Sequence, residues 1–188
     1  MNLKDLLSEK KKPIQERWFN LIVETYPPET VQFLKSQKDR FANPVGSTIF
    51  QGIEDIFDHI LQGSEPEKIG IFLDNVIRIR AVQDFTSSQA IGFIFQLKKV
   101  IREELKNEIR ENGLSDELLA LESEIDNLAL LSFDIFMKCR EQVYDLKAND
   151  LRNMTYTLLR KSNLIYDIDE KGSVPKTDNY IDKLKEKR

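Results

Sequence analysis

The sequence predicts an all-α fold: a single helical-bundle domain with a long C-terminal helix. Apolar residues recur three and four positions apart along most of the chain, as they do on one face of an α-helix. Five of the six prolines, together with Gly63 and Gly113, fall where such a helix would begin or end. With 188 residues, 40% of them hydrophobic, the chain can form one domain with a real core. We expect this domain to span residues 1–148, and residues 149–188 to form a helix extension and a flexible C-terminal tail.

The first part of the chain is expected to form three short helices. Leu3, Leu6 and Leu7 mark the first, and Pro13 is tolerated in the first turn of the second. The apolar positions of the second helix are Ile14, Trp18, Leu21 and Ile22. Tyr26 and the two prolines that follow it should end this helix. The third helix carries Val31, Phe33 and Leu34.

The central part of the chain should form three amphipathic helices. Residues 45–62 make the first, which stops at Gly63 in the left-handed position that favours glycine. Its inward residues are Ile49, Ile53, Ile56, Phe57 and Ile60. The sequences Ser64-Glu65-Pro66-Glu67 and Thr86-Ser87-Ser88-Gln89 read as capping boxes that begin the next two helices. The earlier of these runs over residues 69–82. The later runs to Asn112-Gly113, with Ile91, Phe95, Leu97 and Ile101 inward.

Ser115 is expected to cap the last helix, and no stop signal follows it before about Ser162. At ~1.5 Å per residue this helix would reach roughly 70 Å, longer than a domain of this size is wide, so part of it must project or bend. Its expected core positions are Leu128, Leu131, Ile135 and Cys139. A sparser stripe that includes Phe136 gives the candidate interface residues Val143, Leu146, Met154 and Leu158. This stripe either packs on the first helices or forms a dimer seam, and its spacing is too irregular for a regular heptad.

Charged residues are placed within segments that are otherwise built for burial. Arg80 shares a helical stripe with Ile69, Leu73 and Val76. A guanidinium there is unfavourable unless a carboxylate or an anion meets it. The nearest carboxylates in sequence belong to Asp39, Asp74 and Asp84. The candidate polar cluster or ligand pocket consists of Asp39, Arg40, Asn43, Arg78, Arg80 and Asp84. Such a group is either a structural salt-bridge corner, or a ligand pocket or signalling joint.

Composition limits the classes of partner. The net charge of -4 and the pI near 5.3 argue against nucleic-acid binding, which needs clustered Lys and Arg. No apolar run approaches the ~18 residues that would span a bilayer, and the start of the chain lacks the apolar region of a signal peptide. The single cysteine, Cys139, fits a reducing compartment. We therefore expect a cytoplasmic protein without membrane insertion.

No catalytic motif accompanies the charged segments. The only histidine, His59, has no second imidazole and no cysteine pair at the spacing of metal ligands. The sequence also contains no Gly-rich phosphate loop, nucleophile elbow or kinase signature. We expect no catalytic residues, no metal site and no cofactor, haem included, in a protein that is not an enzyme.

Several motifs point to one family. They are Arg17-Trp18-Phe19, Thr25-Tyr26-Pro27, Phe33-Leu34, residues 39–46, Leu73-Asp74, residues 77–85 and Ser88-Gln89-Ala90. In these motifs the chain resembles the N-terminal domain of RsbRD-type RsbT co-antagonists, over residues 3–150. The resemblance implies a cytoplasmic, all-helical, non-enzymatic input module that usually precedes an output domain such as a STAS domain or a histidine kinase. Too few residues follow Ser162 for either output. The resemblance also implies a distant relation to the globin-like input domains of related co-antagonists, which are dimers without haem.

Two functions from different classes remain open. The first is a sensory or regulatory domain of bacterial stress-response signalling that acts through protein–protein contacts, with protein partners that include a second copy in a homodimer. The second is a binder of a small anionic ligand or redox cofactor that uses Arg40, Arg78 and Arg80, because planar guanidinium groups suit carboxylate and phosphate. A pocket lined by two of these arginines without a carboxylate would favour the ligand. Full pairing with Asp39 or Asp84 would favour a structural role.

Overall fold

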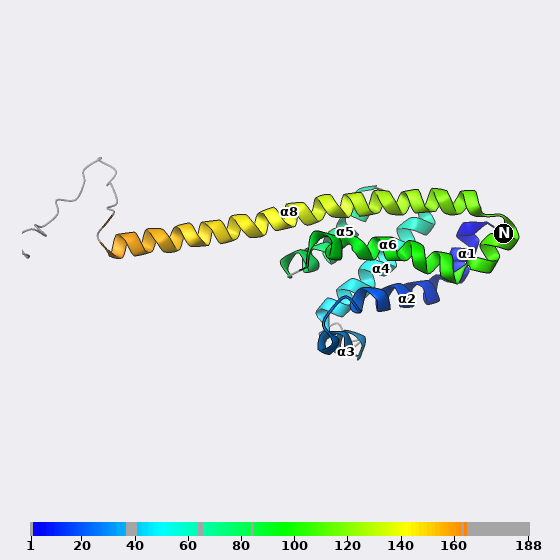
Figure 1. Ribbon diagram of the computed structural model, residues 1–188, viewed down its shortest axis with the longest axis horizontal. Coiled ribbons are helices and arrows are strands. Elements are labelled where there is room, and N and C mark those ends of the chain that lie inside the picture. Colours follow the sequence, from blue (N-terminus) through cyan, green and yellow to red (C-terminus); the bar gives the residue numbers. More distant parts are fainter. Residues whose placement is uncertain (1, 37–40, 64–65, 84, 163, 165–188) are drawn as a thin grey trace, which may run out of the picture. The chain divides into compact units, whose positions relative to one another are not determined.

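The computed structural model describes residues 2–36, 41–63, 66–83, 85–162 and 164. This part of the chain contains eight α-helices and no strand, which confirms the predicted all-α fold with a long C-terminal helix (Figure 1). The helices are α1 (Leu3–Glu9), α2 (Lys11–Val23), α3 (Pro28–Ser36), α4 (Pro44–Gln62), α5 (Pro66–Val82), α6 (Ser87–Glu104), α7 (Lys106–Asn112) and α8 (Ser115–Lys161).

The ends of several helices are fixed by the local sequence. The Asn43 side chain accepts a hydrogen bond from the Gly46 backbone N–H at 2.8 Å and so caps α4, while Gly63 ends this helix at φ 67°. Thr86 and Gln89 form the predicted capping box at the start of α6. The other predicted capping box, over residues 64–67, lies outside the residues whose side chains the structure describes.

The predicted helix from Thr86 to Gly113 is two helices, so this prediction was wrong. Leu105 separates α6 from α7 with a backbone of φ -113° and ψ 16°, and its side chain is completely buried. No glycine or proline marks the break. The tertiary packing of Leu105 therefore overrides the continuous helical propensity of its neighbours. Phe95 was also placed wrongly: it is 49% exposed, because the buried face of α6 is formed by residues such as Ile94, Leu97 and Ile101.

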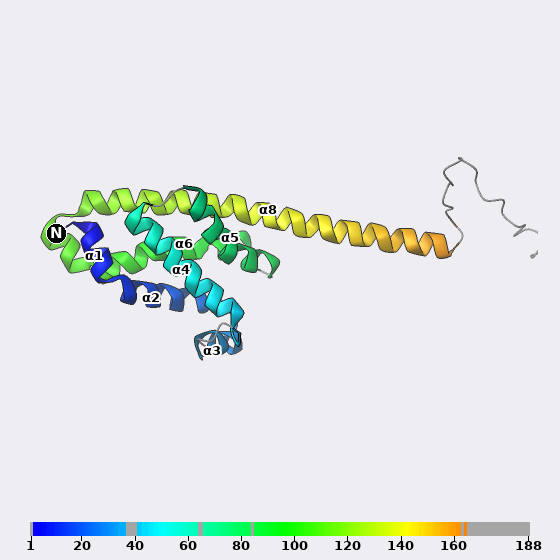
Figure 2. The ribbon, with the colours of Figure 1, turned by 180° about the vertical axis from the view of Figure 1, so that it is seen from behind.

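The core lies between α2, α4, α5 and α6, with α4 packed along α5 and α2 packed against both α4 and α6 (Figures 1 and 2). All five inward residues predicted for α4 are buried, as are Leu3, Leu6 and Leu7 of α1. The helices α4 and α5 approach so closely that a Cβ atom added to Gly52 would lie 2.3 Å from Cγ2 of Val76. Trp18 donates a hydrogen bond from Nε1 to the Phe93 carbonyl at 2.7 Å and so joins α2 to α6.

The first part of α8 belongs to the same core. Leu128 and Cys139 are buried as predicted, and Leu131 and Ile135 are partly buried against the core. Phe136 was assigned to the sparser stripe but is only 4% exposed. Polar contacts hold this part of the helix: Arg102 of α6 forms an ion pair with Glu122, Lys98 pairs with Asp126, and Arg140 donates to the Ala81 carbonyl at 3.1 Å.

Two units are distinguished in the chain, Met1–Val143 and Tyr144–Arg188. In the second unit the structure describes residues 144–162 and 164, which are helical through Lys161, close to the predicted end near Ser162. Of the predicted interface residues, Val143 is half-buried at the end of the first unit, whereas Leu146, Met154 and Leu158 are exposed. Among the described residues, no helix has the length and apolar character needed to cross a membrane.

Candidate functional site

Arg80 lies in the last turn of α5 and is completely buried. The predicted stripe is correct, because Ile69, Leu73 and Val76 are buried on the same face of the helix. A long cationic side chain therefore occupies a position where the periodicity of the helix places apolar residues. Since Lys and Arg are almost never fully buried without a partner, the surroundings of this guanidinium need an explanation.

The guanidinium is only partly satisfied by hydrogen bonds. Its Nη2 donates to Oγ1 of Thr25 at 2.9 Å and to the Gln89 carbonyl at 3.0 Å. Its Nε and Nη1 are buried without an acceptor. In the described part of the chain no carboxylate pairs with Arg80, and Asp74, one of the expected partners, instead pairs with Arg78 at 3.0 Å.

Three aromatic rings surround the guanidinium of Arg80. The guanidinium carbon lies 4.1 Å from the ring centre of Phe85, 5.4 Å from that of Tyr26 and 5.7 Å from that of Phe93. Tyr26 and Phe85 also contact each other edge to face, with ring centres 5.1 Å apart. The negative faces of aromatic rings attract a cation, so this cage compensates part of the lost hydration.

Burial shifts the pKa values of the two polar side chains in this cluster. It lowers the pKa of Arg80 from the ordinary guanidinium value, and the neighbouring Tyr26 opposes that shift. Burial also raises the pKa of Tyr26, against the effect of the Arg80 charge. The phenol lies near the guanidinium without a hydrogen bond of good geometry. Arg80 keeps its charge, because a guanidinium does not deprotonate in proteins.

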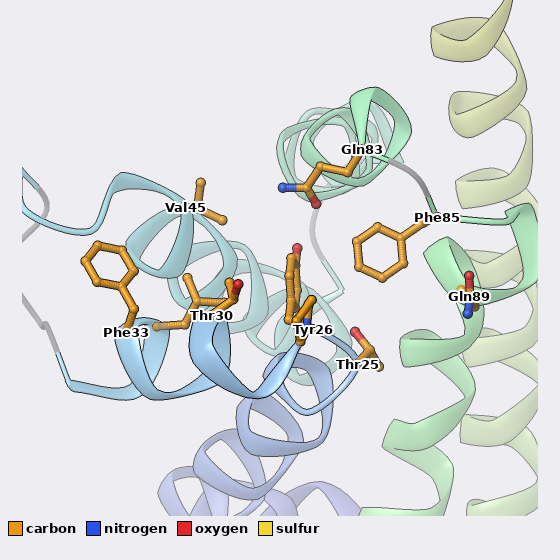
Figure 3. A pocket seen from close by; sticks show the side chains of 10 residues that line it. Thr25, Tyr26, Thr30, Phe33, Val45, Gln83, Phe85 and Gln89 are labelled. Atoms are coloured by element: carbon orange, nitrogen blue, oxygen red, sulfur yellow. The ribbon is translucent and has the colours of Figure 1, made fainter.

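A cavity of about 490 Å³ lies against this cluster, and we call it the Arg80 pocket. Its lining residues are Thr25, Tyr26, Pro27, Thr30, Phe33, Leu34, Val45, Gln83, Phe85 and Gln89. Figure 3 shows the Tyr26 ring at the centre, with its hydroxyl directed toward the Gln83 amide and with Phe85 beside it. The Tyr26 hydroxyl and Oε1 of Gln83 are both buried without a hydrogen-bond partner. Two unsatisfied oxygens are therefore buried among the side chains that line the pocket.

The predicted polar cluster is not assembled as a unit among the described residues. Asp39, Arg40 and Asp84 lie outside the residues that the structure describes. Arg78 is exposed and forms its ion pair with Asp74, one turn earlier on α5. Asn43 is buried, but its side chain caps α4 and donates to the Leu34 carbonyl at 3.0 Å. Of the predicted site residues that are described, only Arg80 lies beside residues of the Arg80 pocket, and it is not itself one of the lining residues.

Sequence reasoning missed the residues that meet Arg80. Thr25 and Tyr26 were assigned only to a helix break and a family motif, and Gln89 only to a capping box and a family motif. The one available signal was the burial of Arg80 itself: a buried guanidinium without an acid needs carbonyl, hydroxyl or aromatic partners. Which residues supply them depends on how the end of α2 meets the start of α6.

The expected lack of a metal site stays a prediction. Within the described ranges, no three or more side chains of His, Cys, Asp or Glu gather where they could hold a metal ion. His59 is half-buried on α4, and Cys139 is buried on α8 with a free thiol whose pKa burial raises.

A second candidate surface lies on the distal residues of α8. Leu151, Met154 and Leu158 are 66%, 64% and 62% exposed, and we call these three residues the distal stripe. Their spacing of three and four places them on one face of the helix, and Tyr144, which is also exposed, lies seven residues before Leu151. The predicted interface contained Met154 and Leu158 but not Leu151 or Tyr144. A search for a seven-residue period would have found them.

Comparison with known proteins identifies the family to which the chain belongs. The model of the RsbT co-antagonist protein rsbRD N-terminal domain matches residues 13–151. No curated protein and no solved structure that was compared matches the chain. The family is one of regulatory input domains in stress signalling. Because the match covers well over half of the 188 residues, the chain belongs to the RsbT co-antagonist protein rsbRD N-terminal domain family.

Proposed function

We propose that this protein is a non-enzymatic sensory or regulatory domain that acts through protein–protein contacts made by the distal residues of α8. Family membership supports a regulatory role. The observation that carries the proposal is the exposure of the distal stripe, in which each side chain is more than 60% exposed. Large apolar side chains gathered on one exposed helix face are typical of interaction surfaces.

The spacing of the distal stripe indicates what kind of partner it takes. Leu151 and Leu158 are seven residues apart with Met154 between them, which gives the a and d positions of a short coiled coil. A helix with the same spacing can bury this face, and the simplest such helix is α8 of a second copy. Lys147 and Lys161 occupy the neighbouring d positions, so the apolar seam is short and the association should be weak.

The proposal also retains three expectations about the domain boundary, the location and the partners of the protein. It places the domain boundary near residue 148, just before the distal stripe. It places the protein in the cytoplasm, and the free buried thiol of Cys139 supports this location. It excludes nucleic acid as a partner, because the net charge of the chain is -4.

Sedimentation velocity of the full chain over a range of concentrations tests the proposal. The test variant is Leu151→Glu with Met154→Glu. The matched control is Leu119→Glu with Leu130→Glu, which adds the same charge at two exposed positions of the same helix. Wild type and control should associate as concentration rises, whereas the test variant should stay monomeric with unchanged helicity. A wild-type chain that is monomeric at every concentration, or a test variant that associates like wild type, would contradict the proposal.

A further inference from the structure

We propose that the Arg80 pocket binds a small monocarboxylate with an apolar body. The carboxylate would lie at the Tyr26 hydroxyl and the Gln83 amide, close to the charge of Arg80. This inference does not depend on the contacts proposed for α8. It assigns to the domain a ligand class, and hence a chemical signal, that the family description does not contain.

The charge of Arg80 is the first reason to expect an anion. The guanidinium is completely buried, and in the described part of the chain it meets two neutral oxygen acceptors and three rings but no carboxylate. Aromatic rings attract a cation, but they do not supply the in-plane acceptors that Nε and Nη1 need. Among the described residues the buried Glu122, by contrast, is paired, because it accepts a hydrogen bond from Arg102.

The polar groups of the pocket wall are the second reason. Tyr26 is 8% exposed and lines the pocket, and its hydroxyl lies near the Arg80 guanidinium without a hydrogen bond of good geometry. Oε1 of Gln83 is unsatisfied as well, and Figure 3 shows the two side chains directed toward each other. A half turn of the Gln83 amide presents its NH2 group at the same place. A carboxylate there would accept hydrogen bonds from the phenol and from the amide.

The distance to the positive charge fits this placement. The Phe85 ring is one of the side chains that line the pocket, and its centre lies 4.1 Å from the guanidinium carbon. The Tyr26 ring, which also lines the pocket, has its centre 5.4 Å from the same carbon, so the charge lies next to two lining side chains. The guanidinium is completely buried, which strengthens its electrostatic interactions. An anion in the pocket would be attracted without direct contact with Arg80.

The apolar wall defines the rest of the ligand. Phe33, Leu34, Val45 and Phe85 form much of the lining, and a volume of about 490 Å³ is in the range of small-molecule sites. Inorganic phosphate or sulfate would leave this wall uncovered. A molecule with one carboxylate and an aromatic ring or a short alkyl chain covers the wall and meets the polar groups together.

The single tryptophan provides a reporter for this pocket. Trp18 is buried and stacks on Phe93 with ring centres 6.1 Å apart, and Phe93 is one of the rings around Arg80. A ligand that rearranges the Arg80 cage should therefore change the Trp18 emission. Binding to the native state should also raise the temperature of unfolding.

The experiment titrates the full chain with benzoate and with hexanoate and follows both signals. The neutral counterparts are benzamide and hexanamide, and inorganic phosphate is the anion without an apolar body. At least one carboxylate should give a saturable change, with its amide about tenfold weaker or worse and with phosphate silent. The proposal fails if neither carboxylate binds, if the amides bind as tightly, or if phosphate produces the same change.

Variants connect binding to the named groups. Tyr26→Phe keeps the ring and removes the hydroxyl, so carboxylate affinity should fall about tenfold. Arg80→Met should abolish the preference for carboxylate over amide. Arg78→Met removes an exposed arginine two residues away and should bind like wild type. If Arg80→Met does not fold, Tyr26→Phe decides alone. Wild-type affinity in Tyr26→Phe, or an equal loss in Arg78→Met, would overturn the assignment.

Discussion

The surroundings of Arg80 and the distal stripe of α8 depart from ordinary burial in opposite directions. Arg80 places a charge where its helix buries apolar residues, and it is completely buried. The distal stripe places leucine and methionine where charged residues are usual, and each is more than 60% exposed. Two other charged groups follow the ordinary rules: Arg78 is exposed beside Asp74, and the buried Glu122 is paired with Arg102.

Changes in the two regions should affect different properties of the protein. A charge buried without a carboxylate lowers the stability of the fold unless other groups compensate it, so changes around Arg80 should alter folding. Exposed apolar side chains contribute little to the stability of the monomer but offer area to a partner, so changes in the distal stripe should alter association. Local rules tend to be broken at functional sites, and here two breaks of opposite kind lie in one chain.

The largest contrast is expected between two leucine truncations. Leu97→Ala in the core removes a completely buried side chain and should lower the free energy of unfolding by about 3 kcal/mol through the cavity it leaves. Leu158→Ala in the distal stripe should change it by less than about 0.5 kcal/mol at concentrations where the chain is monomeric. Urea denaturation measures both. A large loss of unfolding free energy in Leu158→Ala would show that this position contributes to the monomer fold. The contrast drawn between the two regions would then be wrong.

A smaller effect separates the volume of Arg80 from its charge. Arg80→Ala leaves a cavity among three aromatic rings and should cost about 2 kcal/mol, part of the cavity term being offset by removal of an unpaired charge. Arg80→Met fills similar volume without charge and should lie within about 1 kcal/mol of wild type. Denaturant midpoints at pH 7 distinguish the two. An equal loss in both variants would indicate a charge partner such as Asp39 or Asp84, as the salt-bridge interpretation requires.

More of the fold than of the candidate site could be predicted from the sequence. The helices α4 and α5, their inward faces and the capping box before α6 follow from periodicity and cap residues, which act within a few positions of each other. The break at Leu105 and the exposure of Phe95 could not be predicted, because they depend on packing between helices. The burial of Arg80 was predictable from its stripe. Its partners were not, since Thr25 and Gln89 reach it from two other segments.

The smallest expected effect is a change in pH dependence at Tyr26. Burial raises the pKa of its hydroxyl in the folded protein, whereas in the unfolded chain it titrates near the ordinary value of about 10. Between those two values the unfolded state binds fewer protons than the folded state, so the free energy of unfolding falls as the pH rises. The contribution of the protonated, buried phenol is thus fully present below about pH 10 and is lost as the pH climbs toward the folded pKa.

Tyr26→Phe removes this titration and should make the alkaline loss of stability shallower than in wild type. Denaturation curves at intervals between about pH 8 and pH 11 measure the slope. Tyr156→Phe removes one phenol hydroxyl from an exposed side chain in the distal part of α8 and serves as the matched control, with the wild-type slope expected. If Tyr26→Phe and Tyr156→Phe have the same slope, the phenol beside Arg80 does not titrate differently in the folded and unfolded chain. The burial assigned to Tyr26 beside Arg80 would then be wrong. The two regions would then not differ in their electrostatic environment in the way argued above.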